Sequence, residues 1–325
     1  MRPARELLQP LLDLHGAIRR DVVAASERAG DSLNAVAREE QADTIYAIDV
    51  IAEEVLDRFA SQLREPVVLI AEGIAGGRRT YPHGTDEAGA AWRIIVDPID
   101  GTRGLMYQKR SGWILSAVAP NRGPATSLKD VVLAVQTEIP LRKQHLSDQL
   151  VTIEGGPVTA SRYDRLTGTS ARLEFAPSRA TTIAHGYASV VRFFPGGREQ
   201  MAAIDDAMVG GALGPGEPGK ARCFEDQYAS TGGQLYELMA GHDRFIADLR
   251  GLSPAATLCC HPYDICTAPI AAASGVILTD PAGRPLDDVP LDTITNVSWV
   301  GYANEHLRRQ VEPHLQAALQ SHGWI

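Results

Sequence analysis

The stretch DPIDGT at residues 97–102 directly follows the apolar run WRIIV at residues 92–96. The run is short and β-branched, which predicts a buried strand. That strand ends in two carboxylates, Asp97 and Asp100, and the proline between them stiffens the turn that holds them. Two acids in such a turn are also typical of an ordinary capped β-turn, so this stretch alone leaves both interpretations open.

The donor atoms of this turn suit a hard cation beside an anion. Mg²⁺ demands near-octahedral oxygen ligation, and Asp97, Asp100 and the carbonyl group of Ile99 can be aimed at one point. Gly101 and Thr102 offer backbone N–H groups without side-chain obstruction, which suits an anion at the opening of a turn or helix. A metal beside such N–H groups indicates phosphate chemistry.

Three further acids lie where other predicted elements begin or end. Glu72 follows a predicted strand and shares a sheet edge with Asp97 if the two strands pair. Asp264, in HPYDICTAP, opens a predicted helix whose small residues allow close approach to a metal. Asp49 lies at the start of a predicted amphipathic helix. Each acid alone is also an ordinary terminal residue of its element.

Apolar periodicity predicts helices and strands that interleave along the chain. The predicted helices cover residues 3–30, 48–63, 198–209, 228–241, 263–273 and 305–321, and the predicted strands cover residues 66–71, 92–96, 113–119, 131–136, 171–175, 182–187, 244–248 and 276–279. We expect the strands at residues 113–119 and 131–136 to pair antiparallel. The pattern is weakest between residues 141 and 219.

The chain is expected to divide into two halves. Residues 1–140 form an α+β half that carries Asp49, Glu72 and the DPIDGT metal site. Residues 141–325 form an α/β half that carries Asp264.

Composition excludes several classes of protein. The 325 residues are 44% hydrophobic and 22% charged, with a mean hydropathy of −0.12, as in soluble globular proteins. Lys plus Arg number 31 against 40 Asp plus Glu, a net charge of −9, so we expect no nucleic-acid partner. No apolar run approaches the roughly 18 residues of a membrane span, and MRPARELLQP lacks the apolar region of a signal peptide. We therefore expect no membrane association, a cytoplasmic location and four reduced cysteines.

Four segments, in order, resemble the inositol monophosphatase family. They are ADTIYAID at residues 42–49, LIAEG at 69–73, VDPIDGT at 96–102 and PYDICTAPIAAASGVILTD at 262–280. The family consists of lithium-sensitive, Mg²⁺-dependent phosphomonoesterases and includes bisphosphate nucleotidases and one class of fructose-1,6-bisphosphatases. The resemblance implies an α/β fold, a layered αβαβα sandwich of the sugar-phosphatase type. It also implies a homodimer that hydrolyses a small phosphorylated metabolite such as inositol monophosphate.

The resemblance also assigns roles to residues of this chain. Two or three Mg²⁺ ions are implied. Glu72, Asp97 and the Ile99 carbonyl group would hold one ion, and Asp97, Asp100 and Asp264 a second, so that Asp97 bridges. The implied catalytic residues are Glu72, Thr102 and Asp49, of which Thr102 and Asp49 orient and help to deprotonate the attacking water. The implied substrate-binding residues are Asp100, Gly101, Thr102, Ser230 and Thr231.

The sequence departs from the family pattern without losing a principal ligand. Gly73 replaces the second glutamate of the LIAEG element, and Tyr263 replaces a tryptophan. Arg103 and Gly104 follow the central signature, where Thr-Asn or Ser-Asn is usual.

Clues to the substrate are few. Inositol phosphatases contact the polyol through an acid, for which Asp248, 16 residues before Asp264, is the nearest candidate. Lys109 and Arg110 form either a solvated turn or contacts to a second anionic group. The segment RFFPGGR at residues 192–198 predicts a strand end and a turn.

Two alternatives to an inositol monophosphatase activity stay open. One is a phosphatase of 3′-phosphoadenosine 5′-phosphate or fructose 1,6-bisphosphate. The other, from a different class, is a catalytically inactive homologue that binds or regulates. Retention of the acidic residues and Thr102 argues against the inactive homologue.

Overall fold

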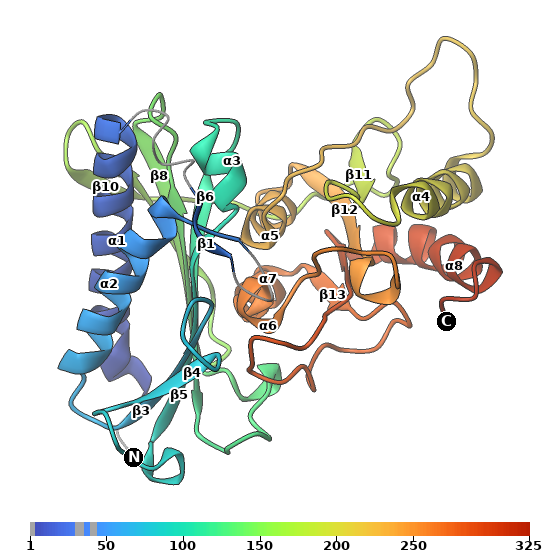
Figure 1. The fold of residues 1–325 in the computed structure, drawn as a ribbon. Helices are drawn as coiled ribbons and strands as arrows, with labels where there is room; N and C mark the ends of the chain where they lie inside the picture. Colours follow the sequence, from blue (N-terminus) through green and yellow to red (C-terminus); the bar gives the residue numbers. More distant parts are fainter. Residues whose placement is uncertain (1–3, 30–35, 40–43) are drawn as a thin grey trace.

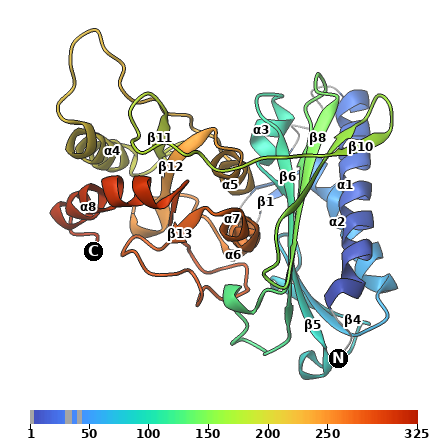
Figure 2. The same ribbon diagram turned by 180° about the vertical axis from the view of Figure 1, so that it is seen from behind.

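The computed structural model describes residues 4–29, 36–39 and 44–325, which form five layers of alternating helices and sheets (Figures 1 and 2). The described helices are α1 (Leu8–Ala29), α2 (Ala47–Gln62), α3 (Thr102–Met106), α4 (Arg198–Leu213), α5 (Thr231–Met239), α6 (Pro262–Ile265), α7 (Ala268–Ser274) and α8 (Glu305–Ser321). The described strands are β1 (Val36–Glu39), β2 (Thr44–Tyr46), β3 (Val67–Ala71), β4 (Arg78–Tyr81), β5 (Trp92–Asp100), β6 (Gly112–Pro120), β7 (Leu133–Ile139), β8 (Leu146–Ile153), β9 (Thr159–Asp164), β10 (Thr169–Arg172), β11 (Tyr187–Val190), β12 (Asp243–Asp248), β13 (Ile277–Thr279) and β14 (Trp299–Tyr302).

The larger sheet has eight strands in the order β10-β9-β8-β7-β6-β5-β3-β4. Its pairs are antiparallel except for β3 with β5, which run parallel. The predicted antiparallel pairing of the third and fourth strands is confirmed, since β6 pairs with β7 from Gly112 opposite Ile139 to Val118 opposite Leu133.

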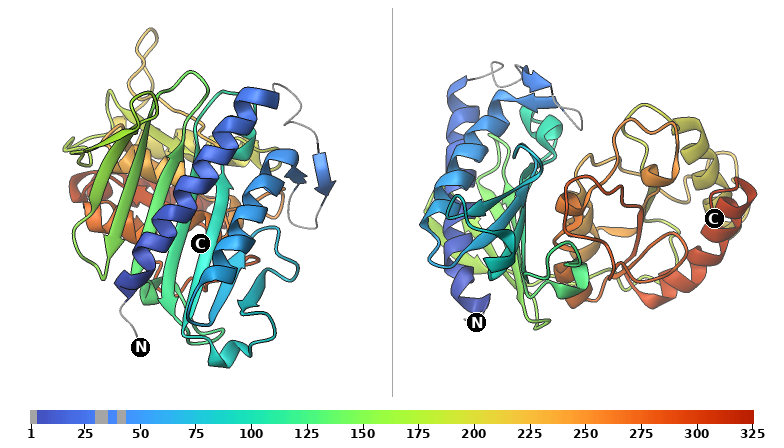
Figure 3. Two further views of the ribbon diagram at one scale, coloured as in Figure 1. Left: turned by 90° about the vertical axis from the view of Figure 1, so that its left-hand side faces the viewer. Right: turned by 60° about the horizontal axis from the view of Figure 1, so that its bottom comes forward.

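Helices α1 and α2 cover one face of this sheet (Figure 3). The apolar stripes predicted for both helices are buried there, because Leu11, Ile18 and Val22 of α1 and Ile48 of α2 are fully shielded from solvent. Burying such side chains stabilises the fold by roughly 1.5–3 kcal/mol each.

The other face of the large sheet packs on α5, α6 and α7, and these helices pack in turn on a second sheet. That sheet has the strand order β11-β12-β14-β13. Helices α4 and α8 cover its outer face. The predicted α/β class with αβαβα layering is therefore confirmed.

The structure corrects several element predictions. Strands β8 and β9 were not predicted, and the strand expected at residues 182–187 starts only at Tyr187. The helix expected at residues 263–273 is split into α6 and α7, because Pro269, in the first turn of α7, has no N–H group to donate to the carbonyl group of Ile265. The division at residue 140 stays a prediction; β8, β9 and β10 belong to the same sheet as β3 to β7.

The described residues can be compared with the expectations about membrane spans and cysteines. Across residues 4–29, 36–39 and 44–325, no helix has both the length and the apolar character needed to cross a membrane. The cysteines are free thiols, of which Cys260 and Cys266 are buried and Cys223 and Cys259 are partly buried.

A buried histidine links α1 to the large sheet. The ring nitrogens of His15 lie 2.9 Å from Thr137 Oγ1 and 2.8 Å from Ser116 Oγ, on β7 and β6. Burial, with a smaller effect from the charge of Arg19, lowers the pKa of His15 from 6.5 to about 3. Below pH 6.5 the unfolded chain therefore binds a proton that the folded chain does not bind. The free energy of unfolding consequently decreases as the pH is lowered in that range.

We predict that His15 accounts for a loss of about 2 kcal/mol in the free energy of unfolding between pH 7 and pH 5. The raised pKa of Asp100 acts in the opposite direction in this range, so the test is the difference between two proteins. Between pH 7 and pH 5 the free energy of unfolding, measured with urea, should fall by about 2 kcal/mol more in the wild type than in His15→Gln. His306→Gln, on an exposed position of α8, is the matched control and should keep the wild-type dependence. An unchanged pH dependence in His15→Gln would contradict the assignment.

Candidate active site

An irregularity in β5 brings Asp97 and Asp100 to the same side of the large sheet. Residues three apart on a regular strand point to opposite faces. Here Asp97 pairs with Leu115 and Asp100 with Trp113, so β5 spends one more residue than β6 over this interval, as in a β-bulge. The predicted turn after the strand is thus part of β5, which continues to Asp100 before α3 begins.

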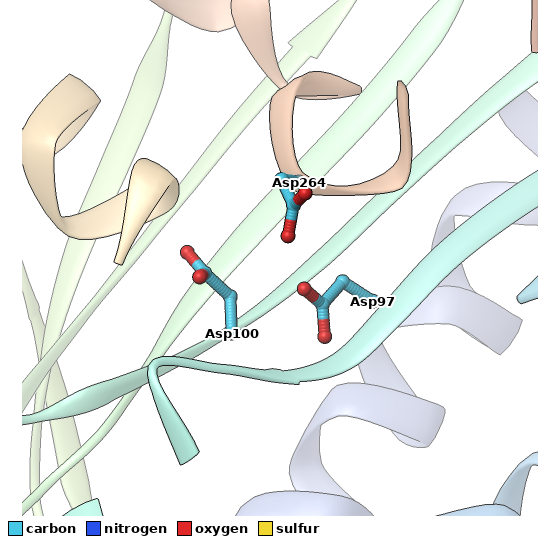
Figure 4. Close-up of side chains that lie close together, drawn as sticks. All are labelled: Asp97, Asp100 and Asp264. Carbon is cyan, nitrogen blue, oxygen red and sulfur yellow. The ribbon is translucent and has the colours of Figure 1, made fainter. Parts of the chain in front are cut away.

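Asp264 completes a cluster of three carboxylates. It comes from α6, and its amide-facing oxygen Oδ2 accepts a hydrogen bond of 2.6 Å from the backbone N–H of His261. Figure 4 shows the side chains of Asp97, Asp100 and Asp264 pointing toward one another. One carboxylate oxygen from each lies within 4.8 Å of the others, a spacing that can hold a metal ion.

The electrostatics of this cluster suit a cation. Burial raises the pKa of Asp97 well above its ordinary value, and the charges of Asp100, Asp264 and Glu72 add to the effect. Burial and then the charge of Asp100 likewise raise the pKa of Asp264. Burial raises the pKa of Asp100 to about 6, although three hydrogen bonds favour its charged form. Buried carboxylates that repel one another are a fitting donor set for a divalent cation, which prefers oxygen ligands.

The start of α5 positions Asp100. Asp100 Oδ2 accepts hydrogen bonds from Ser230 Oγ at 2.8 Å and from the N–H of Gly232 at 2.6 Å, and Asp100 Oδ1 accepts one from the N–H of Thr231 at 3.3 Å. Gly101 must be small here, because its φ is +83° and a Cβ would lie 2.9 Å from Ser230 Cβ. Ser230 and Thr231 therefore line the same cleft as the carboxylates.

Asp49 reaches the cluster through Thr102. Asp49 caps α2, since its Oδ2 accepts a hydrogen bond of 2.8 Å from the N–H of Tyr46. Its Oδ1 lies 3.1 Å from Thr102 Oγ1, which is also 2.7 Å from the carbonyl oxygen of Ile99. The threonine hydroxyl can thus give its single proton to either acceptor. Residues 42 and 43 of the ADTIYAID segment lie outside the described residues.

Glu72 lies beside Asp97 as the parallel strand pairing requires. Strand β3 pairs with β5 with Ala71 opposite Val96, and the residue that follows each of these two is a carboxylate, Glu72 or Asp97. Glu72 lines the cleft together with Ile99, Gly101 and Thr102. All the predicted site residues therefore meet in one region, while their roles stay predictions.

The rest of the cleft was missed by the sequence analysis. Its further lining residues are Arg103, Phe193, Phe194, Ala229, Arg250, Leu258, Cys259 and Tyr263. Phe193 and Phe194 belong to the segment for which only a strand end and a turn were expected. The one signal for Arg103 was its unusual place after the DPIDGT signature, and Arg250 had none.

Asp248, Lys109 and Arg110, which were suggested as further substrate contacts, are not among the residues that line the cleft. Asp248 is fully buried, and Arg250 binds it through Nε at 2.9 Å and Nη2 at 2.6 Å. Arg110 pairs with Asp226 and stacks over Tyr228, and neither it nor Lys109 is among the lining residues.

Solved structures with the same architecture include a fructose-1,6-bisphosphatase and a protein that is similar to inositol-1 monophosphatase. A hypothetical protein of Pyrococcus horikoshii with similarities to inositol-1 monophosphatase is 15% identical, with a TM-score of 0.66 over 97% of this chain and 98% of that chain. The extragenic suppressor protein SuhB of Bartonella henselae is 14% identical, with a TM-score of 0.66 over 96% and 98%. The fructose-1,6-bisphosphatase of Leishmania major is 13% identical, with a TM-score of 0.69 over 97% and 93%.

The fold is that of the inositol monophosphatases and fructose-1,6-bisphosphatases. The predicted sugar-phosphatase type of fold is thereby confirmed. No protein-family model and no curated protein sequence matches the chain. At these low identities the inositol monophosphatase fold alone is shared, and the chemistry must be argued from the residues themselves.

We predict that Mg²⁺ raises the melting temperature of the wild-type protein and not that of Asp97→Asn. A ligand at ten times its Kd stabilises the folded state by about 1.4 kcal/mol, which corresponds to a few degrees for a chain of this size. Differential scanning fluorimetry with and without Mg²⁺ measures both proteins. Asp206→Asn, exposed on α4, is the control and should respond as the wild type does. Equal shifts in Asp97→Asn and the wild type would exclude the cluster as the metal site.

Proposed function

We propose that this protein is a Mg²⁺-dependent phosphomonoesterase that acts on a small phosphorylated metabolite. The observation that carries the proposal is the buried cluster of Asp97, Asp100 and Asp264, whose oxygens lie within 4.8 Å of one another. The fold shared with the fructose-1,6-bisphosphatase of Leishmania major and with a protein that is similar to inositol-1 monophosphatase supports it. The reaction breaks the ester P–O bond: a water oxygen becomes bonded to phosphorus, and the alcohol leaves with a proton.

The residues that would hold the metal ions are Glu72, Asp97, Asp100, Asp264 and the carbonyl group of Ile99. Bound Mg²⁺ neutralises phosphate oxygens, lowers the pKa of a water molecule and stabilises the leaving alkoxide. Four side-chain carboxylates would roughly balance the charge of two such ions, so the net charge of −9 does not oppose binding of an anionic substrate.

Thr102 and Asp49 would handle the proton of the attacking water. When Thr102 Oγ1 donates its proton to Asp49 Oδ1, 3.1 Å away, the hydroxyl presents a lone pair that can orient a water molecule. When the water is deprotonated, its proton moves to Thr102 Oγ1, and the original hydroxyl proton of Thr102 passes to Asp49. Glu72, which lines the same cleft, is the third catalytic residue that the sequence resemblance implies.

The phosphate would be bound at the start of α3 and beside the start of α5. Backbone N–H groups of Gly101 and Thr102 suit phosphate oxygens because no side chain obstructs Gly101. Ser230 and Thr231 line the same cleft, and Asp100 connects them to the metal cluster.

The finer parts of the proposal rest on the sequence resemblance and on composition. They are two or three Mg²⁺ ions, inhibition by Li⁺, a homodimer and a cytoplasmic location. Inositol monophosphate, fructose 1,6-bisphosphate and 3′-phosphoadenosine 5′-phosphate are the substrates to compare first. An inactive binding homologue is the competing function, and activity on any phosphate ester with Mg²⁺ would exclude it.

We predict that hydrolysis of a generic phosphate ester requires Mg²⁺ and that Asp97→Asn lowers kcat at least about 10²- to 10³-fold. The reason is that Asp97 follows Val96, which pairs with the residue before Glu72, and also lies close to Asp100 and Asp264, so that it would serve both ions. Steady-state assays with Mg²⁺, with chelator and with the Asp206→Asn control measure this. Near-native kcat in Asp97→Asn would refute the two-metal proposal.

We predict that Thr102→Ala lowers kcat about 10²-fold while Mg²⁺ affinity, measured by calorimetry, stays within about twofold. The hydroxyl contacts Asp49 and the proposed water, whereas the carboxylate cluster is intact in this variant. Thr102→Ser keeps the hydroxyl and should retain most of the rate. A collapse of metal affinity together with the rate would show that the role assigned to Thr102 is wrong.

A further inference from the structure

The acid at the end of β12 is blocked by an arginine. Asp248 is the position that the sequence suggested for contact with a polyol hydroxyl. Its carboxylate is fully buried and accepts hydrogen bonds from Arg250 Nε at 2.9 Å and 3.1 Å, from Nη2 at 2.6 Å and from the Arg250 backbone N–H at 3.1 Å. Asp248 therefore has no free oxygen facing the cleft, and Arg250 lines the cleft in its place.

A backbone carbonyl group and two aromatic rings fix the guanidinium group of Arg250 in addition to Asp248. Nη1 donates to the carbonyl oxygen of Leu258 at 3.0 Å, and the guanidinium carbon lies 4.6 Å from the centre of the Phe193 ring and 5.5 Å from that of Phe194. A guanidinium group has five N–H donors, and Asp248 and Leu258 take three of them. No acceptor for the other two is found within residues 4–29, 36–39 and 44–325.

The charge of Arg250 also acts on the proposed metal cluster. It opposes the rise in pKa that burial imposes on Asp100 and Asp264, so the cation lies within electrostatic range of both carboxylates. A fixed, desolvated guanidinium group with unused donors is well suited to a carboxylate or phosphate group and poorly suited to a neutral hydroxyl group.

We propose, on the basis of the phosphatase function above, that Arg250 determines specificity by binding an anionic group on the alcohol part of the substrate. The substrate class is a phosphate monoester that carries a second anion, either carboxylate or phosphate. The ring of Phe193 keeps the guanidinium plane in place and excludes water from it. Where a carboxylate was expected to bind a polyol, the cleft of this protein is thus lined by the positively charged Arg250.

Two matched substrate pairs test the proposal and separate the two sources of the anion. Glycerol 2-phosphate and 2-phosphoglycerate differ by one carboxylate, and fructose 1-phosphate and fructose 1,6-bisphosphate differ by one phosphate. In the wild type with Mg²⁺, kcat/KM should be higher for the anionic member of at least one pair, by about one to two decades. Equal kcat/KM within both pairs, or preference for the neutral members, would overturn the proposal.

Variants then assign the preference to this residue. Asp248→Asn/Arg250→Gln removes both charges together, so that no buried carboxylate is left unpaired, and it should reduce the preference at least about tenfold. Arg250→Lys, which keeps the positive charge, should retain part of the preference. The control Lys109→Gln/Arg110→Gln changes the two cations outside the cleft and should leave the preference unchanged. A preference that survives in a folded Asp248→Asn/Arg250→Gln protein, or that is lost in the control, would overturn the assignment to Arg250.

Failure of the proposed function has a different signature. If the wild type hydrolyses none of the four esters and no generic phosphate ester, the phosphatase function falls and this proposal falls with it. If it hydrolyses the neutral esters as well as the anionic ones, the phosphatase function stands and only the role of Arg250 is refuted.

Discussion

Three hydrogen bonds to Asp100 hold the two halves of the candidate site together. The carboxylate belongs to β5 of the large sheet, and its donors are Ser230, Thr231 and Gly232 at the start of α5, the helix that leads into β12 of the second sheet. These donors offset part of the free energy needed to bury the charge. The carboxylate cluster therefore depends on the packing of one sheet against the other through the helix layer, which also brings Asp264 on α6 close to Asp97 and Asp100.

Every acid of the site lies at an end, at a bulge or in the first turn of an element, and this position resolves a conflict between burial and charge. Charges that are buried among apolar strands destabilise a protein unless donors or cations compensate them. At the end of β3, at the bulge of β5 and in the first turns of α2 and α6, backbone N–H groups are not used by regular secondary structure. The N–H groups of Tyr46, Ile99 and His261 each donate to a site carboxylate. The carboxylates can thus remain close together and raise one another's pKa without disrupting the core.

The sequence allowed good prediction where the residue pattern is local and apolar. The strands around DPIDGT, the stripes of α1 and α2, and α8 each follow from a single period. The prediction failed at β8, where the polar residues Asp148 and Thr152 are buried on the same face as Leu150, at positions that an alternating pattern would make apolar. Asp148 is tolerated there because Arg162 donates to it at 2.7 Å and 2.8 Å, and such a pairing between strands cannot be read from either strand alone.

The same reasoning explains why the acidic part of the site could be predicted and the basic part could not. Glu72, Asp97 and Asp264 each follow or open a recognisable element, whereas Arg250 is fixed by contacts with Leu258 and Phe193 from irregular loops. The cleft consequently has two parts with opposite charge, one from the large sheet and α6, the other from the end of β12. The charge of the acidic part changes when cations bind, while Asp248 keeps Arg250 in place in either state. Specificity for the alcohol part of a substrate can therefore be set by the protein itself, independently of the ions that the chemistry requires.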